Sequence, residues 1–252
     1  MEKYNLKISA VIICKNEALT IGECIGALRR TVDEIIVVDS GSSDGTQEIV
    51  RSMGIEPVYH KFAGFGAQKQ FACELARNTW VLSIDCDEVA TEQLCKSLEC
   101  LIDDGLHSAY TITRRFKFLG RTFRHGSGSV DHPIRVFRKD TCSFDNSEVH
   151  ESILVRGNIG ELEGELVHDS YFTLNQYFEK FNQYTDLGAK KLNRLGKRRS
   201  VVGNGLCIPV YFLKHYVLGG HYLNGVEGFV WSALSAFHPF VKVTKAWAMR
   251  KT

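Results

Sequence analysis

The chain has 252 residues, of which 44% are hydrophobic and 24% are charged, and its formal net charge is +2. This is the composition of an ordinary soluble globular protein with enough residues for a packed core, and so small a net charge gives no support for binding to nucleic acid. Only four prolines are present, which argues against long disordered tails.

The first residues, MEKYNLKISAVIIC, carry mixed charges and contain no small-residue cleavage site. We therefore predict a strand there and no signal peptide. The eight cysteines include no C-x-x-C pair, which argues against zinc knuckles. Without an export signal, we expect a cytoplasmic protein with reduced thiols.

Strand and helix patterns alternate through the first hundred residues. Apolar runs rich in β-branched residues, typical of strands covered on both faces, occur at KISAVIIC, EIIVVD, EPVYH and WVLSI. Each run is followed by a helical pattern, the last of which begins at a Thr91 cap. Residues 1–104 are therefore predicted to form an α/β half with a Rossmann-like, mostly parallel sheet and helices on both faces.

The pattern changes after residue 104. Four strand-like runs follow without crossover helices between them, namely SAYTITRRF, PIRVFRK, ESILVRG and ELEGELVH. Residues 105–172 are therefore predicted to extend the same domain as a mixed sheet. Residues 173–252 are predicted to be a helical region that is both basic and aromatic, and no run in it approaches the roughly 20 apolar residues of a membrane-spanning helix.

Polar residues follow three of the predicted strands at the point where each strand ends. The segments are CKNEA, DSGSSDG and DCDE. Ligands of parallel α/β sheets bind outside the carboxyl ends of the strands, so these segments should open onto one rim. Asp39 ends the second strand, where it could be a turn residue or could accept hydrogen bonds from a nucleotide base or ribose.

Asp85, Asp87 and Glu88 follow the fourth strand. Residues two apart in an extended segment point to the same side, so Asp85 and Asp87 can face one ligand while Cys86 turns into the core. Hard divalent ions prefer carboxylate oxygens, so the pair is a candidate metal site. The alternative is that these acids are solvated and cap the next helix, and we assign that capping role to Glu88, near Thr91.

The segments SAVIICKNEA, EIIVVDSGSSDGT and WVLSIDCDE together resemble family 2 glycosyltransferases of the GT-A fold. The resemblance covers about the first hundred residues, which would then form the nucleotide-sugar-binding half. It implies a UDP-sugar donor, Mg²⁺ or Mn²⁺ as cofactor, and displacement with inversion at the sugar carbon.

Further segments are similar to one subgroup of this family, the bacterial lipopolysaccharide inner-core β-1,4-glucosyltransferases. They are FGAQKQFA, RVFR near Arg135, VHESI and LVHDSY. The similarity implies transfer of glucose from UDP-glucose to a heptose of a lipid A-linked core oligosaccharide. It also implies a cytoplasmic enzyme in peripheral contact with the inner membrane.

The resemblance implies roles for individual residues of the donor site. Asn16, Glu17 and Asp39 would bind the donor, Asp85 would lie near the ribose and metal, and Asp87 would ligate the metal. Lys69 could reach a phosphate or be an ordinary solvated lysine. His168 could lie near the metal or diphosphate or be structural.

An inverting transfer also needs a base that takes the proton of the acceptor hydroxyl. Glu151, beside His150, is the first candidate, and Asp145 and Glu148 are its rivals.

The C-terminal region combines a basic cluster, KKLNRLGKRR, with several aromatic residues. The aromatic residues are Phe229, Trp231, Phe237, Phe240 and Trp247. Such a combination suits the surface of an anionic membrane, and it could equally be a helical lid on the core.

Two other functional classes stay open. A nucleotidyltransferase would need a glycine-rich phosphate loop after the first strand, where CKNEALT stands instead. A non-catalytic nucleotide-sugar-binding module is disfavoured by the intact pair of Asp85 and Asp87. Within the enzyme hypothesis, another nucleotide sugar or another glycan acceptor is the alternative.

Overall fold

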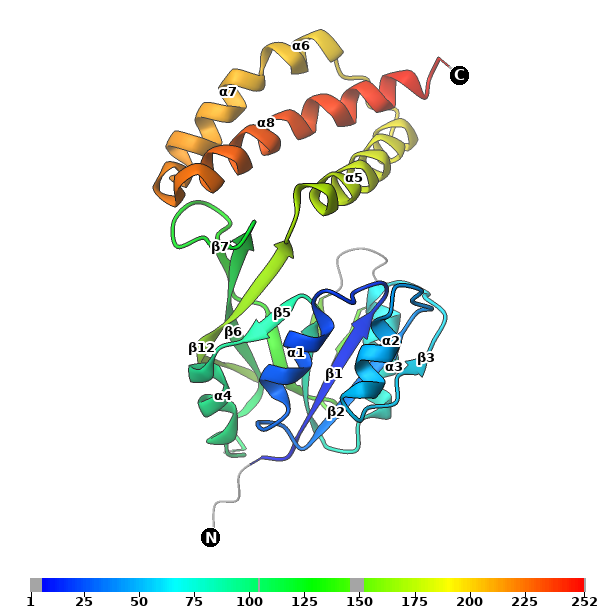
Figure 1. Cartoon of the computed structure of the whole chain (residues 1–252), viewed down its shortest axis with the longest axis vertical. Coiled ribbons are helices and arrows are strands. Elements are labelled where there is room, and N and C mark those ends of the chain that lie inside the picture. Colours follow the sequence, from blue (N-terminus) through cyan, green and yellow to red (C-terminus); the bar gives the residue numbers. More distant parts are fainter. Residues whose placement is uncertain (1–5, 104, 146–151, 252) are drawn as a thin grey trace. The chain divides into compact units, whose positions relative to one another are not determined.

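The computed structural model describes residues 6–103, 105–145 and 152–251. The chain divides into two compact units, one of Met1–Arg114 with Asp131–His168 and the other of Arg115–Val130 with Asp169–Thr252. The second unit thus combines the C-terminal helices with a segment taken from the middle of the chain (Figure 1).

The sheet of the first unit begins with four parallel strands. In spatial order they are β3 (Val58–Tyr59), β2 (Glu34–Asp39), β1 (Ile8–Cys14) and β4 (Trp80–Asp85). The order continues through β9 (Ile134–Arg138), β6 (His107–Phe118), β12 (Asn158–Tyr171) and β5 (Glu88–Ala90). Because β9 is antiparallel to both β4 and β6, the extension is mixed, as the sequence predicts.

The described residues also form two short strands and a separate antiparallel pair. The two-residue strands β7 (Arg121–Thr122) and β8 (Val130–Asp131) pair with β6. The strands β10 (Cys142–Phe144) and β11 (Ile153–Val155) form a separate antiparallel pair.

The register of the parallel strands brings the predicted site residues to one edge. Cys14 is paired with Asp39 on one side of β1, and Ile13 is paired with Asp85 on the other. Neighbouring strands lie about 4.8 Å apart, so the backbones at Asp39 and Asp85 are separated by about 10 Å.

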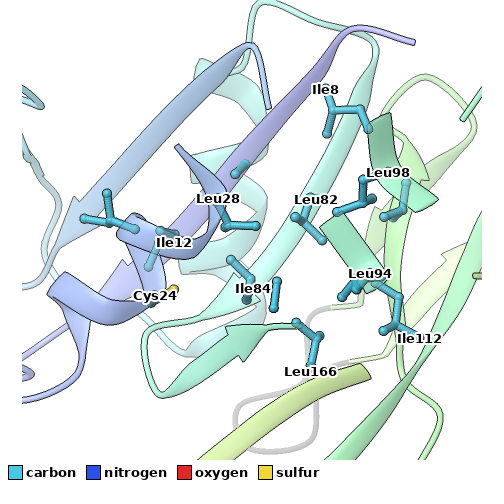
Figure 2. Close-up of a cluster of buried hydrophobic side chains, with 14 of the residues drawn as sticks. Ile8, Ile12, Cys24, Leu28, Leu82, Ile84, Leu94, Leu98, Ile112 and Leu166 are labelled. Carbon is cyan, nitrogen blue, oxygen red and sulfur yellow. The ribbon is translucent and has the colours of Figure 1, made fainter. Parts of the chain in front are cut away.

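Four helices cover the sheet, and the strands are apolar on both faces. The helices are α1 (Ile21–Leu28), α2 (Thr46–Ser52), α3 (Phe65–Leu75) and α4 (Glu92–Glu99). Ile12 and Leu82 pack with residues of α1 and α4, as Figure 2 shows. Their neighbours Val11 and Val81 face the opposite way and pack with α3. This alternation buries both faces of the central strands, which explains their nearly continuous apolar sequences.

The second unit has an aromatic core. Phe118 and Phe123 are fully buried, and Tyr177 and Phe181 of α5 (Leu174–Arg194) pack against them. The ring of Trp231, in α8 (Gly225–Ala248), lies 4.7 Å from that of Phe116. Trp231 is therefore partly buried against this core, which favours the packed alternative for this residue over contact with a membrane.

A helical stretch with little burial precedes α8. It consists of α6 (Val201–Leu206), α7 (Ile208–Leu213) and the π-helical turn η1 (Lys214–Leu218), and the short 3₁₀ helix η2 (His221–Asn224) follows. Within the described residues, this stretch of 18 residues is the one helix long and apolar enough, by length and composition, to cross a membrane. Lys214 and His215 lie within it, and the sequence by itself predicted no run of this kind.

We predict that Gly164→Ala destabilises the first unit. Gly164 of β12 has φ +94°, and a Cβ there would lie 2.3 Å from the backbone nitrogen of Leu94 in α4. Left-handed backbone and this overlap together should lower the free energy of unfolding by about 2 kcal/mol or more.

Gly26→Ala is the matched control, because Gly26 lies in α1 and a Cβ added there would meet no atom within 4 Å. Alanine should raise helix stability there by up to ~1 kcal/mol. Urea unfolding followed by circular dichroism measures both variants, and equal midpoints would contradict the close approach of β12 to α4.

Candidate functional site

The loops that follow β1 and β2 are joined by hydrogen bonds. The amide of Asn16 donates to the hydroxyl of Ser42 (2.8 Å), and the side-chain oxygen of Asn16 accepts from the amide of Ser43 (2.9 Å). The amide of Glu17 donates to Thr46 Oγ1 (2.8 Å). Asn16 adopts a left-handed backbone with φ 57°, a conformation that asparagine tolerates better than most residues. These two predicted donor-binding residues therefore also shape the rim.

Asp39 ends β2 as predicted and is 1% exposed. Its carboxylate accepts hydrogen bonds from the amides of Gly41 and Ser42 (both 2.9 Å), from the Ser42 hydroxyl, and from Gln47 Nε2 (2.7 Å). Burial favours protonation, but these hydrogen bonds outweigh it and hold the pKa of Asp39 below its ordinary value. Asp39 is thus an ionised acceptor that organises its own loop.

Asp85, at the end of β4, is bound by two cations. Lys69 Nζ lies 2.8 Å from one carboxylate oxygen, and Arg135 Nη2 lies 2.7 Å from the other. Burial opposes ionisation, but Arg135 and then Lys69 outweigh it and hold the pKa of Asp85 well below its usual range. The Lys69 side chain is only 5% exposed, so the alternative of a solvated lysine is wrong.

Glu88 is fully buried, and its predicted capping role is wrong. The side chain of Thr91 caps α4 by accepting from the amide of Leu94. Glu88 instead begins β5, a strand that pairs with β12 and turns this carboxylate inward. There it accepts from Arg135, from Arg114 Nη1 (2.9 Å) and from the amide of Asp85 (3.3 Å).

These contacts form one chain of alternating charges, which we call the ion network. Its members, in order of contact, are Lys69, Asp85, Arg135, Glu88, Arg114 and Asp131. Arg114 donates two hydrogen bonds to Asp131, from Nη2 (2.6 Å) and from Nε (2.9 Å). Burial works against charge on Arg114 and Arg135, but their acidic partners raise the pKa of both guanidinium groups.

Sequence reasoning did not identify Arg114, Arg135 or Asp131 as site residues. A weak signal was present, because Arg114 and Arg135 interrupt the predicted strands SAYTITRRF and PIRVFRK with charge. A buried charge in a strand needs a partner, but the pattern does not reveal which one.

Asp87 and His168 are brought together as a pair. His168 Nε2 lies 3.3 Å from Asp87 Oδ2, and the two side chains are 25% and 14% exposed. Burial alone would lower the pKa of His168, but Asp87 outweighs burial and raises it. Cys86, between the two aspartates, is buried in the core as predicted.

The donor set at Asp87 and His168 fits a divalent cation that completes its coordination with phosphates and water. One carboxylate oxygen and one imidazole nitrogen suit Mn²⁺, and the carboxylate suits Mg²⁺. Within the described ranges, no group of three or more His, Cys, Asp or Glu side chains is assembled that could hold a metal ion. Asp85, the third predicted ligand, faces Lys69 and Arg135.

The candidates for the catalytic base are only partly covered by the described residues. Glu148, His150 and Glu151 lie outside them. Asp145 accepts a hydrogen bond from the amide of Ser152 (3.0 Å), and its own amide donates to the Ser152 carbonyl (2.9 Å). These two hydrogen bonds therefore connect Asp145 to Ser152, the described residues on either side of this segment.

Residues 9–153 match the family model for Glycosyl transferase family 2. The chain belongs to this family. It is 32% identical to the lipopolysaccharide core biosynthesis glycosyltransferase LpsC of Rhizobium meliloti (strain 1021), over 95% of this chain and 92% of that one. It is also 31% identical to an uncharacterized glycosyltransferase of Rickettsia typhi, over 95% of this chain and 86% of that one.

Solved structures align with about half of the chain. Glucosyl-3-phosphoglycerate synthase from Mycobacterium tuberculosis, in complex with Mn²⁺ and UDP-glucose, is 23% identical with a TM-score of 0.34. The alignment covers 46% of this chain and 44% of that one, less than half the length of either. Mannosyl-3-phosphoglycerate synthase from Rubrobacter xylanophilus is 27% identical over 49% of this chain and 43% of that one, with a TM-score of 0.37. The predicted family and the GT-A fold class are confirmed.

We predict that Glu88→Gln lowers the free energy of unfolding by about 3 kcal/mol, because it leaves Arg135 and Arg114 without their shared buried anion. Urea unfolding at constant pH measures the change. The control, Glu92→Gln, removes a solvent-exposed carboxylate paired with Lys96 and should leave the unfolding midpoint unchanged. Equal effects of the two substitutions would contradict a stabilising role for the ion network.

Proposed function

We propose that this family 2 glycosyltransferase transfers a hexose from a UDP-sugar, with inversion, to a sugar of the lipopolysaccharide inner core. Glucose is the first candidate for the hexose and heptose for the acceptor. The observation that carries the proposal is similarity to LpsC along almost the whole of both chains. The acids gathered at the ends of β2 and β4 support the donor half of the reaction.

On the donor side, Asp39 would accept hydrogen bonds from the uracil or ribose, with Asn16 and Glu17 shaping the same rim. Lys69 and Arg135 hold Asp85 ionised, so it is an acceptor of fixed orientation for a ribose hydroxyl. Asp87 and His168 would hold Mg²⁺ or Mn²⁺, which, when bound, neutralises charge that grows on the UDP leaving group.

On the acceptor side, a carboxylate would take the proton of the attacking hydroxyl. Inversion requires this hydroxyl to approach the sugar carbon from the face opposite the leaving UDP. Glu151 is the proposed base, with Asp145 and Glu148 as rivals.

The proposed acceptor is anchored in lipid A, so the enzyme would work where that lipid is exposed. We place it in the cytoplasm, in peripheral contact with the cytoplasmic face of the inner membrane. The excess of basic residues in the C-terminal region supports attraction to anionic lipids.

A panel of UDP-, GDP- and TDP-sugars, assayed for hydrolysis and transfer with and without EDTA, tests the proposal. We expect turnover of UDP-glucose that is lost with EDTA and restored by Mg²⁺ or Mn²⁺. Turnover of another nucleotide sugar would change the donor. Binding of UDP-glucose without any turnover would instead support a non-catalytic nucleotide-sugar-binding module.

Asp87→Ala should reduce metal-dependent UDP-sugar turnover by ~100-fold or more, because it removes the carboxylate that would hold the ion. Glu99→Ala removes an exposed carboxylate from α4 and serves as the control. Circular dichroism spectra should be the same for both variants. Unchanged turnover by Asp87→Ala would contradict the proposal that Asp87 holds the metal ion.

Glu151→Gln should bind UDP with the affinity of the native protein and lose transfer by ~100-fold or more, because the amide cannot take the proton. Isothermal titration calorimetry and a transfer assay separate the two effects. Full transfer by this variant would move the base to Asp145 or Glu148, and Asp145→Asn and Glu148→Gln would then decide between them.

A further inference from the structure

A row of exposed apolar side chains runs along α6, α7 and η1. We call it the apolar stripe, and it consists of Val202, Leu206, Val210, Leu213 and Val217. These residues are three or four positions apart, so they share one face of the helical stretch. Each side chain is between 50% and 75% exposed. An isolated exposed leucine needs no explanation, but a continuous apolar face does.

The opposite face of the same stretch packs against α8. The ring of Phe212 lies 5.3 Å from that of Phe229, and the ring of Tyr216 lies 5.7 Å from the same side chain. Figure 1 shows α7 running alongside α8. This packing fixes the orientation of the stretch, so the apolar stripe faces away from α8.

Positive charge precedes the apolar stripe along the chain. Residues 187–226 contain seven Lys or Arg residues and no Asp or Glu. Six of the seven are exposed and lie at the end of α5 or between α5 and α6, and we call them the basic cluster: Lys190, Lys191, Arg194, Lys197, Arg198 and Arg199. Lys214, also exposed, lies within the helical stretch itself. An apolar face beside exposed positive charge is complementary to an anionic lipid surface.

We propose that the apolar stripe and the basic cluster form a membrane-docking surface. The stripe inserts into the boundary between headgroups and acyl chains of an anionic bilayer, and the helical stretch lies in the membrane plane. The proposal rests on the proposed membrane-surface location and adds the surface and the mode of insertion. The sequence by itself points to the basic cluster together with five aromatic residues for this contact, and none of those aromatic residues belongs to the stripe.

Two features favour in-plane insertion over a spanning helix. The 18 residues from Val201 to Leu218 extend over about 27 Å, slightly less than the ~30 Å hydrocarbon core. One side of the helix contacts α8, which itself carries Lys242 and Lys245. A second copy of the chain is disfavoured as the occupant, because two basic clusters would repel each other across such a contact.

Sedimentation of the full chain with vesicles tests the docking surface without donor or acceptor. The vesicles are phosphatidylcholine with about 30 mol% phosphatidylglycerol, and phosphatidylcholine alone. We expect binding to the anionic vesicles that weakens as the salt concentration rises. Equal binding to both compositions would overturn the role of the basic cluster.

Leu206→Ser/Leu213→Ser should weaken the binding to anionic vesicles by ~10-fold or more, because two inserting side chains are lost. The matched control is Leu154→Ser/Ile159→Ser, which replaces two similarly exposed apolar side chains of the first unit. Neutralising Lys197, Arg198 and Arg199 should weaken binding by ~10-fold or more as well. Native affinity in the Leu206→Ser/Leu213→Ser variant would overturn the proposal.

The depth of insertion separates the two orientations. Val202→Trp, Val210→Trp and Val217→Trp are compared by quenching with lipids brominated at shallow or deep acyl positions, each corrected for the native tryptophans. In-plane docking predicts the same shallow depth at all three positions. If the tryptophan at position 210 lies much deeper than the other two, the helix spans the membrane and the proposal is overturned. Dimerisation through the stripe without vesicle binding would also overturn it.

UDP-sugar hydrolysis by the same variants separates this proposal from the proposed reaction. The stripe variants should hydrolyse the donor at the native rate, because none of their substitutions lies in the first unit, which carries the donor site. Vesicle binding by a native chain that turns over no nucleotide sugar would refute the reaction and leave the docking surface standing.

Discussion

The ion network at the junction of β4 and β5 is the constraint on which the candidate site depends. Three cations and three carboxylates are brought together there. Burying a charge is costly unless it is paired, and each buried charge of the network is paired with a neighbouring charge of opposite sign. Glu88 has no exposed surface, so it needs both arginines as partners. Its contact with the amide of Asp85 connects the end of one strand to the start of another.

This arrangement gives the three predicted aspartates different environments. Asp85 is held between Lys69 and Arg135, and Asp39 is surrounded by the amides and side chains of its own loop. Asp87 faces the imidazole of His168, which is itself partly exposed. One carboxylate and one imidazole are donors that suit a divalent cation, whereas both carboxylate oxygens of Asp85 are already bound by cations. The proposed metal site therefore rests on Asp87 and His168, with Asp85 as a neighbour held by Lys69 and Arg135.

The second unit has an aromatic core and an exposed apolar helical stretch. Its core is made of aromatic side chains from a central segment of the chain and from α5, and Trp231 of α8 packs against this core. One face of α7 packs against α8 through Phe212 and Phe229. The apolar stripe lies on another face of the same helical stretch and is exposed. An anionic membrane would cover that face and match the charges beside it.

The sequence by itself determined the parallel α/β half, the mixed extension and the position of Asp39, Asp85 and Asp87 at strand ends. Those features follow from local periodicity and from the rule that parallel strands end at one edge of a sheet. It also carried the family resemblance. It did not determine the partners of the buried charges, because Arg135 and Asp85 are 50 residues apart, and Arg114 and Glu88 are 26 apart.

Only the tertiary structure decided that Glu88 is a buried anion and not a helix cap, and that Lys69 is paired and not solvated. It likewise decided that Trp231 packs against the aromatic core while the stripe from Val202 to Val217 is exposed. The physical reason is the same in each case. Local patterns predict which way a side chain points along its own element, whereas burial and pairing depend on which distant element packs against it.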